Sequence, residues 1–143
     1  GGVQVRKKPY SYKSQTTDLA MCDSYDFILL GAKSSSSATA LMLSAAGRVS
    51  FVRSTTSSTS VARQDSSSGA FWYNYPGKSV GFAASSYIYL ESADMGYGAD
   101  RLSWHLASVG GYRAGNVKML NSDNTYRKVI YCFNSPPPPS PPP

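Results

Sequence analysis

The chain has 143 residues, a hydrophobic fraction of 41% and a formal net charge of +6, from 14 Lys and Arg against 8 Asp and Glu. Its length fits one domain with a sizeable core. Charged residues make up only 15% of the sequence, against ~25% in an average soluble domain. Because the chain is rich in Ser, Thr, Gly and Tyr and has Glu91 as its only glutamate, the composition excludes a mainly helical protein and favours β-structure.

Alternating apolar and polar residues predict the first strands. Two such stretches are Val3–Arg6 and Tyr10–Lys13, each typical of a half-buried strand. The mostly apolar run Tyr25–Leu30, ended by Gly31, predicts a core strand. The four serines at 34–37 predict a surface loop.

The next segment allows two interpretations. The Ala, Leu and Met residues of Thr39–Ala46 favour a helix, whereas Ala46-Gly47-Arg48 followed by the alternating Val49–Arg53 favours a turn and a return strand. We expect the hairpin. Residues 54–60 are Ser and Thr without an apolar partner, and predict either an edge strand or a loop.

A second hairpin is predicted around Pro76-Gly77, a dipeptide typical of a turn. Its strands are Ala70–Tyr75 and Lys78–Ala84. Val61–Arg63 predicts a short strand before it, and the stretch from Asp65 to Gly69 predicts the intervening turn.

The rest of the chain continues the strand pattern, with Gly-rich and Asn-rich loops between strands. The predicted strands are Tyr87–Glu91, Arg101–Leu106, Tyr112–Ala114 and Tyr126–Phe133. The last strand has Val129, Tyr131 and Phe133 on one face. Short strands about every ten residues predict an all-β fold, an antiparallel sandwich of jelly-roll or lectin-like type over residues 1–134.

The only two cysteines are Cys22 and Cys132. One lies just before the first strongly apolar run and the other near the end of the last strand, so we expect a disulfide that joins the two ends of the fold. Closing a loop of this size is worth up to ~4.7 kcal/mol in the chain-entropy model. The alternative is a pair of buried free thiols.

Residues 135–143 form a second, distinct segment with seven prolines in nine positions. Proline fixes φ and has no N–H, so this stretch cannot join a helix or a central strand. Polyproline II remains, and it makes residues 136–143 a rod roughly 25 Å long. A rod of this kind spaces or docks modules, and we expect a neighbouring subunit or module to hold it.

The run SPPPPSPPP resembles the spacers of hydroxyproline-rich glycoproteins of plant and green-algal walls, especially matrix proteins of the pherophorin and mastigoneme type. The resemblance covers this segment alone. It implies an extracellular, fibrous setting, with hydroxylated prolines that carry arabinose and galactose. The implied modification sites are Pro136, Pro137, Pro138, Pro139, Ser140, Pro141, Pro142 and Pro143.

Catalytic chemistry is not predicted. His105 is the single histidine, and although Ser103 shares its strand face, this serine lies in no G-x-S-x-G elbow. Carboxylates of the loop at 91–100 could bind Ca²⁺, but they lack the D-x-D-x-D spacing of a calcium loop. We therefore expect no enzyme and no cofactor.

Carbohydrate binding is the best candidate for a site, because sugars stack on exposed aromatic rings. In the run 71–75, strand alternation separates Trp72 from Tyr73 and Tyr75, so one set must be core and the other could form a platform. Alternatively, both sets are buried between sheets. The candidate glycan-binding residues are Trp72, Tyr73, Tyr75, Tyr97, Asp100 and Arg101.

The function that these features favour is a structural module of an extracellular glycosylated filament or matrix. Its proline-rich segment would join it to other copies or modules of the same polymer. The alternative is a secreted carbohydrate-binding, lectin-like module with a proline-rich spacer. The positive charge fits either a solvated surface or an acidic polysaccharide partner, and no nucleic-acid motif or membrane span is predicted.

Overall fold

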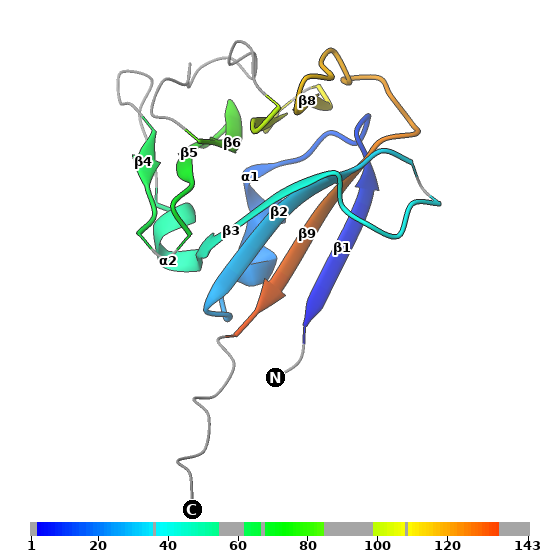
Figure 1. The fold of residues 1–143 in the computed structure, drawn as a ribbon. Coiled ribbons are helices and arrows are strands. Elements are labelled where there is room, and N and C mark those ends of the chain that lie inside the picture. The colour runs from blue at the N-terminus through cyan, green and yellow to red at the C-terminus, as the bar shows by residue number, and fades with distance from the viewer. Residues whose placement is uncertain are drawn as a thin grey trace, which may run out of the picture.

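The computed structural model describes residues 3–35, 37–54, 62–66, 68–84, 99–107 and 109–134. Within them, two antiparallel sheets of four and five strands face each other across a shared core (Figure 1). The predicted all-β sandwich is confirmed. The predicted strand Tyr87–Glu91, most of the Ser/Thr stretch 54–60 and the proline-rich residues 135–143 lie outside the described ranges.

The four-stranded sheet joins the two ends of the described chain. Its strands are β1 (Gln4–Pro9), β2 (Phe27–Lys33), β3 (Leu43–Arg48) and β9 (Arg127–Phe133), in the order β1-β9-β2-β3. All three pairings are antiparallel, and Ile130 of β9 is flanked by Arg6 of β1 and Leu30 of β2. The last strand is therefore a central one, hydrogen-bonded on both sides.

The five-stranded sheet is built from the middle of the chain. It contains β4 (Arg63–Gln64), β5 (Phe71–Tyr75), β6 (Ser79–Ala83), β7 (Leu102–His105) and β8 (Gly111–Ala114), each paired with its neighbour in the sequence. The hairpin predicted around Pro76-Gly77 is confirmed: Gly77 has a φ of 77°, and the Lys78 N–H donates to the Tyr75 carbonyl at 3.0 Å. A positive φ at this point favours glycine.

One core fills the space between the sheets. Trp72, Phe82 and Trp104 enter it from the five-stranded sheet, and Ile28 and Leu30 enter it from the four-stranded sheet. Burying a large apolar side chain contributes about 1.5–3 kcal/mol, so these residues account for much of the stability.

Tyr10 links the two layers through its hydroxyl. It accepts a hydrogen bond from the Trp104 indole nitrogen at 3.1 Å and donates one to the Arg113 carbonyl at 3.1 Å, and both bonds are buried. The prediction of a strand over Tyr10–Lys13 is wrong, because the chain turns after Pro9 and the Tyr12 N–H donates to the Pro9 carbonyl at 2.9 Å. The turn sends Tyr10 inward.

The hairpin predicted after Thr39 is also wrong in its second half. Strand β3 continues through Gly47 to Arg48, and the next four residues form a helical turn, α2 (Val49–Val52). Gly47 is buried, and a Cβ there would lie 2.9 Å from Asp65 Oδ2. Its glycine is therefore required by close packing within a strand, whereas the sequence pattern indicated a turn.

Candidate functional site

The predicted disulfide between Cys22 and Cys132 is confirmed, with an Sγ–Sγ distance of 2.00 Å and a Cα–Cα distance of 5.0 Å. A helical turn, α1 (Thr16–Leu19), and a single 3-10 turn, η1 (Ala20–Cys22), bring Cys22 to the inner face of β9. The bond closes a loop with a sequence separation of 110 and fixes the last strand to the beginning of the fold.

The structure does not support Trp72 and Tyr73 as glycan-stacking rings. The two side chains point to opposite sides of β5, and each is only 1% exposed. Trp72 packs on Phe82 in the core, with ring centroids 5.2 Å apart. Tyr73 belongs to a small cluster with Ala62 and Ala83 on the other face. Of the two interpretations of this strand, the one with both sets buried holds for these two rings.

The other predicted glycan-binding residues are scattered. Tyr75 is half-buried at the end of β5, and Tyr97 lies outside the described residues. Asp100 is exposed, accepts a hydrogen bond from the Ala84 N–H at 3.1 Å and lines an open hollow of about 350 Å³ between β3 and β6. Arg101 is half-buried, and its carbonyl accepts from the Gly115 N–H. No shared surface of these side chains emerges from the described part of the chain.

A different aromatic surface occupies the side of the four-stranded sheet that faces away from the core. Strand register places five apolar residues there, because their neighbours Ile28, Leu30, Ile130 and Cys132 point inward. We call this surface the outer aromatic face, and it consists of Val5, Phe27, Leu29, Tyr131 and Phe133. Phe27 and Phe133 stack with centroids 5.4 Å apart and an interplanar angle of 16°. Val5 is 45% exposed, and the other four are half-buried.

The chain itself covers the neighbouring part of the same side. Val129 points outward like Tyr131, yet it is 0% exposed. The loop between β2 and β3 passes over this region, since a Cβ at the neighbouring Gly31 would lie 3.1 Å from Leu41 Cδ1. In Figure 1 this loop lies beside the end of the sheet remote from the C-terminus. The outer aromatic face is the part of that side nearer to the end of β9.

Sequence reasoning placed Val129, Tyr131 and Phe133 together on one face of the last strand, and the register agrees with this. It did not identify that face as the outer one. The position of Cys132 in the strand was the available signal. A cysteine that forms a disulfide in the interior points inward, so its two neighbours along the strand point outward.

A second cluster lies on the inner side of β1 and β9, around Lys128. The Lys128 Nζ donates hydrogen bonds to the Tyr12 carbonyl at 2.6 Å and to Ser14 Oγ at 2.8 Å. It also lies 5.6 Å from the ring centroid of Trp104 and 5.8 Å from that of Tyr12. The loop after β1 is thereby fixed to the last strand.

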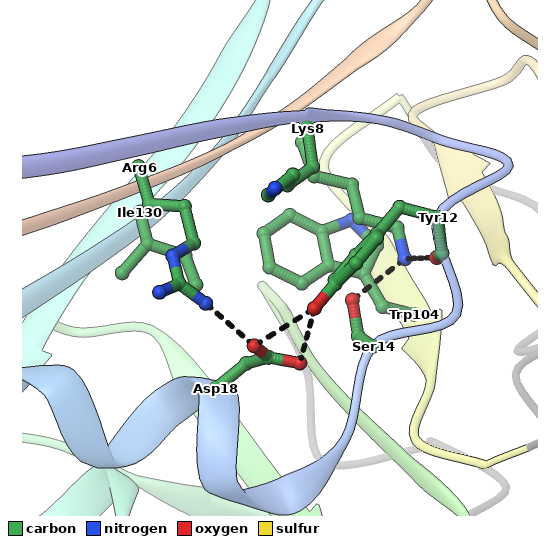
Figure 2. Close-up of a pocket in the computed structure, with 8 residues that line it drawn as sticks. Arg6, Lys8, Tyr12, Ser14, Asp18, Trp104 and Ile130 are labelled. Carbon is green, nitrogen blue, oxygen red and sulfur yellow. Dashed lines mark hydrogen bonds and ion pairs between the residues drawn. The ribbon is translucent and has the colours of Figure 1, made fainter.

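Asp18 completes this cluster from α1. Figure 2 shows its carboxylate facing both the Arg6 guanidinium and the Tyr12 hydroxyl. The Arg6 nitrogen donates to Oδ1 at 2.6 Å, the Tyr12 hydroxyl donates to the same oxygen at 3.1 Å, and the Gln15 N–H donates to Oδ2 at 2.7 Å. The negative charge therefore holds the first turn of α1 against β1.

Burial dominates the ionisation of the Lys128 cluster. Desolvation lowers the pKa of Lys128 from 10.5 to about 7, against the opposing charge of Asp18. Burial also lowers the pKa of His105, and the charge of Lys128 acts in the same direction. The pKa of Tyr12 is raised, first by desolvation and then by Asp18.

The Lys128 cluster is too tightly packed to act on a substrate. Its cavity has a volume of about 10 Å³, which is room for roughly one water molecule. The Lys128 amine is already bonded to two acceptors of its own chain. We conclude that this cluster stabilises the fold, and that the outer aromatic face is the better candidate for a functional surface.

Comparison with protein families, with curated proteins and with solved structures finds no match for this chain. Within the described ranges, no helix is long and apolar enough to cross a membrane. The same ranges contain no group of three or more His, Cys, Asp or Glu side chains that could hold a metal ion.

Proposed function

We propose that the protein is a structural module of an extracellular, glycosylated filament or matrix, joined to neighbouring modules through the proline-rich residues 135–143. In this role the sandwich is a link that transmits tension and does no chemistry. The module's partners are other copies or other modules of the same polymer, which hold the proline-rich segment.

The way β9 is anchored is the observation that carries this proposal. The strand that leads into the proline-rich segment pairs with β1 on one side and β2 on the other. It is also bonded to η1 by Cys132. Just beyond it, the side chain of Asn134 accepts a hydrogen bond from the Asp26 N–H at 3.0 Å. A segment attached at this point can be pulled without first detaching the end of the domain.

The disulfide is compatible with an extracellular location, because such bonds persist in oxidising compartments. The proline and serine residues of 135–143 would carry O-linked sugars. We expect a proteolytic peptide that contains residues 135–143, taken from the protein of its native source, to exceed its unmodified mass by several sugar units. A mass equal to that of the unmodified peptide would refute the glycosylated part of the proposal.

Replacement of Pro137 and Pro138 by Gly tests the role of the segment. Two glycines inside the tetraproline run remove its stiffness and should abolish association, while the melting temperature of the sandwich stays unchanged. Sedimentation velocity and negative-stain electron microscopy would report the assembly. If the variant assembles as well as the wild type, the connection does not depend on a polyproline II rod and the proposal fails.

Carbohydrate binding is the second candidate, supported by the partly exposed rings of Phe27, Tyr131 and Phe133. Sugar faces would stack on these rings and not on Trp72 or Tyr73, which are buried. An oligosaccharide array probed with the wild-type protein and with Tyr131→Ser tests this alternative. Binding that the substitution removes would support it, and no binding by the wild type would exclude it.

A further inference from the structure

We infer that the outer aromatic face is the receptor for residues 135–143 of a second copy of this chain, so that each module holds the proline-rich segment of its neighbour. This inference rests on the proposed function and adds the surface at which the modules join. Three features support it: the exposure of the face, its dimensions and the way the chain leaves β9.

Within the described ranges of the chain, no element is packed over the apolar outer aromatic face. Leu41 and its loop lie over the region around Gly31 and Val129. They do not cover Val5, whose side chain is 45% exposed. The five residues of the face carry no charge; Arg48 lies beside Phe27 on β3, and Lys7 and Arg127 follow toward the opposite end of the strands. Apolar surfaces bounded by polar residues are typical of binding sites.

The dimensions of the face match the tetraproline run. Strand register sets Val5, Tyr131 and Leu29 side by side in a row that continues to Ala46 on β3. Four strands ~4.8 Å apart give this row a length of roughly 14 Å. The four residues Pro136–Pro139 span about 12 Å in polyproline II, at ~3.1 Å per residue.

A second row of side chains lies beside the first on the same face. Phe27 and Phe133 are paired across β2 and β9, two positions along each strand from Leu29 and Tyr131. Two residues along a strand correspond to about 6.6–6.8 Å. A polyproline II rod lying across the strands would therefore contact rings on both sides, as proline-rich peptides do in aromatic-lined grooves.

The sequence around residue 135 favours a rod supplied by a second copy over one from the same molecule. Asn134 is held by its hydrogen bond to the Asp26 N–H, so the direction of the chain is fixed one residue before Ser135. Ser135 precedes a proline, which disfavours the helical conformation that a reversal would need. The prolines that follow are stiff. These constraints disfavour a return of the segment onto the face of its own molecule, so we take the same face of another copy as its receptor.

Such a contact is heterologous, because the face of one copy meets the segment of the next. Heterologous contacts that do not close into a ring generate filaments. A chain of modules would follow without any further surface, each module connected through β9 and its disulfide.

Complementation between two full-length variants tests the inference. The first variant has Tyr131→Ser and Val5→Ser on the face and an intact proline-rich segment. The second has Pro137→Gly and Pro138→Gly and an intact face. Each should be monomeric alone in sedimentation velocity, and an equimolar mixture should form a 1:1 dimer that grows no further, because only one productive contact remains.

A binding measurement gives the same test without assembly. The synthetic peptide SPPPPSPPP is titrated into the variant with Pro137→Gly and Pro138→Gly, called the 137/138 variant. In NMR spectra it should perturb the backbone amide resonances of β2 and β9. The affinity should fall at least about tenfold with Tyr131→Ser, the effect typical of a central aromatic contact. Val109→Ser is the matched control, since Val109 is an exposed valine (41%) outside the face and its substitution should leave the affinity unchanged.

The outcomes separate the inference from the proposed function. If face variants assemble like the wild type while the 137/138 variant does not, another surface holds the segment and only this inference fails. If face variants are monomeric but the 137/138 variant assembles, the faces pair with each other and both fail. A face that binds oligosaccharide but not the peptide overturns this inference and supports the carbohydrate-binding alternative. If a variant with Tyr131→Ser does not fold, the single substitution Val5→Ser, at the edge of the sheet, becomes the deciding variant.

Discussion

The two sheets of the sandwich differ in the sequence separation of the strands that pair within them. In the five-stranded sheet each strand pairs with its sequence neighbour, whereas the four-stranded sheet pairs β9 with β1 and β2, more than 90 residues away in sequence. The disulfide and the Lys128 hydrogen bonds both belong to the four-stranded sheet. One sheet therefore joins the ends of the fold, and the other supplies a locally built layer of the core.

The difference has a mechanical consequence. All strands of the five-stranded sheet lie between Cys22 and Cys132 in sequence, inside the disulfide loop, as do β2, β3 and β9 up to Tyr131. Tension applied to the two ends of the chain passes through β1, α1 and the disulfide, and does not reach the loop. In the four-stranded sheet β1 therefore carries the load, while the five-stranded sheet affects stability without bearing force.

The disulfide should show the largest effect of any change. When the oxidised chain is pulled from its ends in an optical trap, only the 21 residues before Cys22 and those after Cys132 can extend, and the former contribute about 70 Å at ~3.3–3.6 Å per residue. The double substitution Cys22→Ser and Cys132→Ser opens the disulfide loop, which has a sequence separation of 110. It should add about 380 Å to the extension of the unfolded chain at the same rise per residue.

The same double substitution should lower the free energy of unfolding by about 4 kcal/mol, close to the ~4.7 kcal/mol ceiling for a loop of roughly this size. Urea denaturation of the oxidised protein and of the double variant measures it. An oxidised chain that releases the full length under tension would show that the loop is not protected, and the comparison between the sheets would not hold.

Lys128 predicts a pH dependence specific to the four-stranded sheet. Its pKa is 10.5 in the unfolded chain and about 7 in the fold, so between these values the unfolded chain binds more protons. The free energy of unfolding should then rise with pH from 7 to 9.5, by up to roughly 3 kcal/mol. Urea titrations across this range measure the slope.

Lys128→Met is the control, because it removes the titrating group and should flatten the slope. The other groups of the cluster do not mask the effect. The lowered pKa of His105 places its titration below the range, and the raised pKa of Tyr12 places its titration above it. A wild type whose stability is constant from pH 7 to 9.5 would show that the Lys128 amine is not desolvated as described.

Tyr10→Phe tests the contact between the two sheets. Loss of the hydroxyl leaves the buried Trp104 N–H without its acceptor and takes one donor from the Arg113 carbonyl. An unsatisfied buried polar group costs ~1–3 kcal/mol, so we expect a loss of about 2 kcal/mol in a thermal or urea melt. Unchanged stability would mean that another group satisfies the indole nitrogen.

Gly77→Ala should have the smallest effect, and it should be confined to the five-stranded sheet. A Cβ at Gly77 has no atom within 4 Å, but its φ of 77° strains any other residue, at a cost of about 1 kcal/mol. We expect a slightly lower melting temperature and an unchanged force-extension curve of the oxidised protein. Gly69→Ala, with a φ of 79° and equally open space, should behave alike; a changed rupture force in either variant would contradict the division of roles.

Local patterns in the sequence predicted the locally built parts of the fold. Strand alternation and the Pro76-Gly77 dipeptide gave the hairpin of β5 and β6, because both strands and their turn are contiguous. The same reasoning failed at Gly47, where a glycine is needed for contact with Val52 and Asp65, residues that no local pattern connects to it. It also named Trp72 and Tyr73 as candidate glycan-stacking rings although both are buried, because their burial depends on tertiary packing.

The outer aromatic face could be predicted only in part. The run of β9 shows that Tyr131 and Phe133 share a side, and the inward position of Cys132 determines which side it is. Their neighbours Val5, Phe27 and Leu29 come from strands distant in sequence, so the face as a whole depends on a register that the sequence does not specify. The burial of Val129 and the contact of Leu41 with Gly31 are likewise tertiary features.

A photo-crosslink from the outer aromatic face tests the central claim most directly. A benzoylphenylalanine placed at Val5, which is exposed at the edge of the face, would be irradiated in an equal mixture of unlabelled and ¹⁵N-labelled full-length protein. We predict crosslinks to residues 135–143 with half of the products joining a labelled to an unlabelled copy. Crosslinks confined to single copies, or none to the proline-rich segment, would contradict the account.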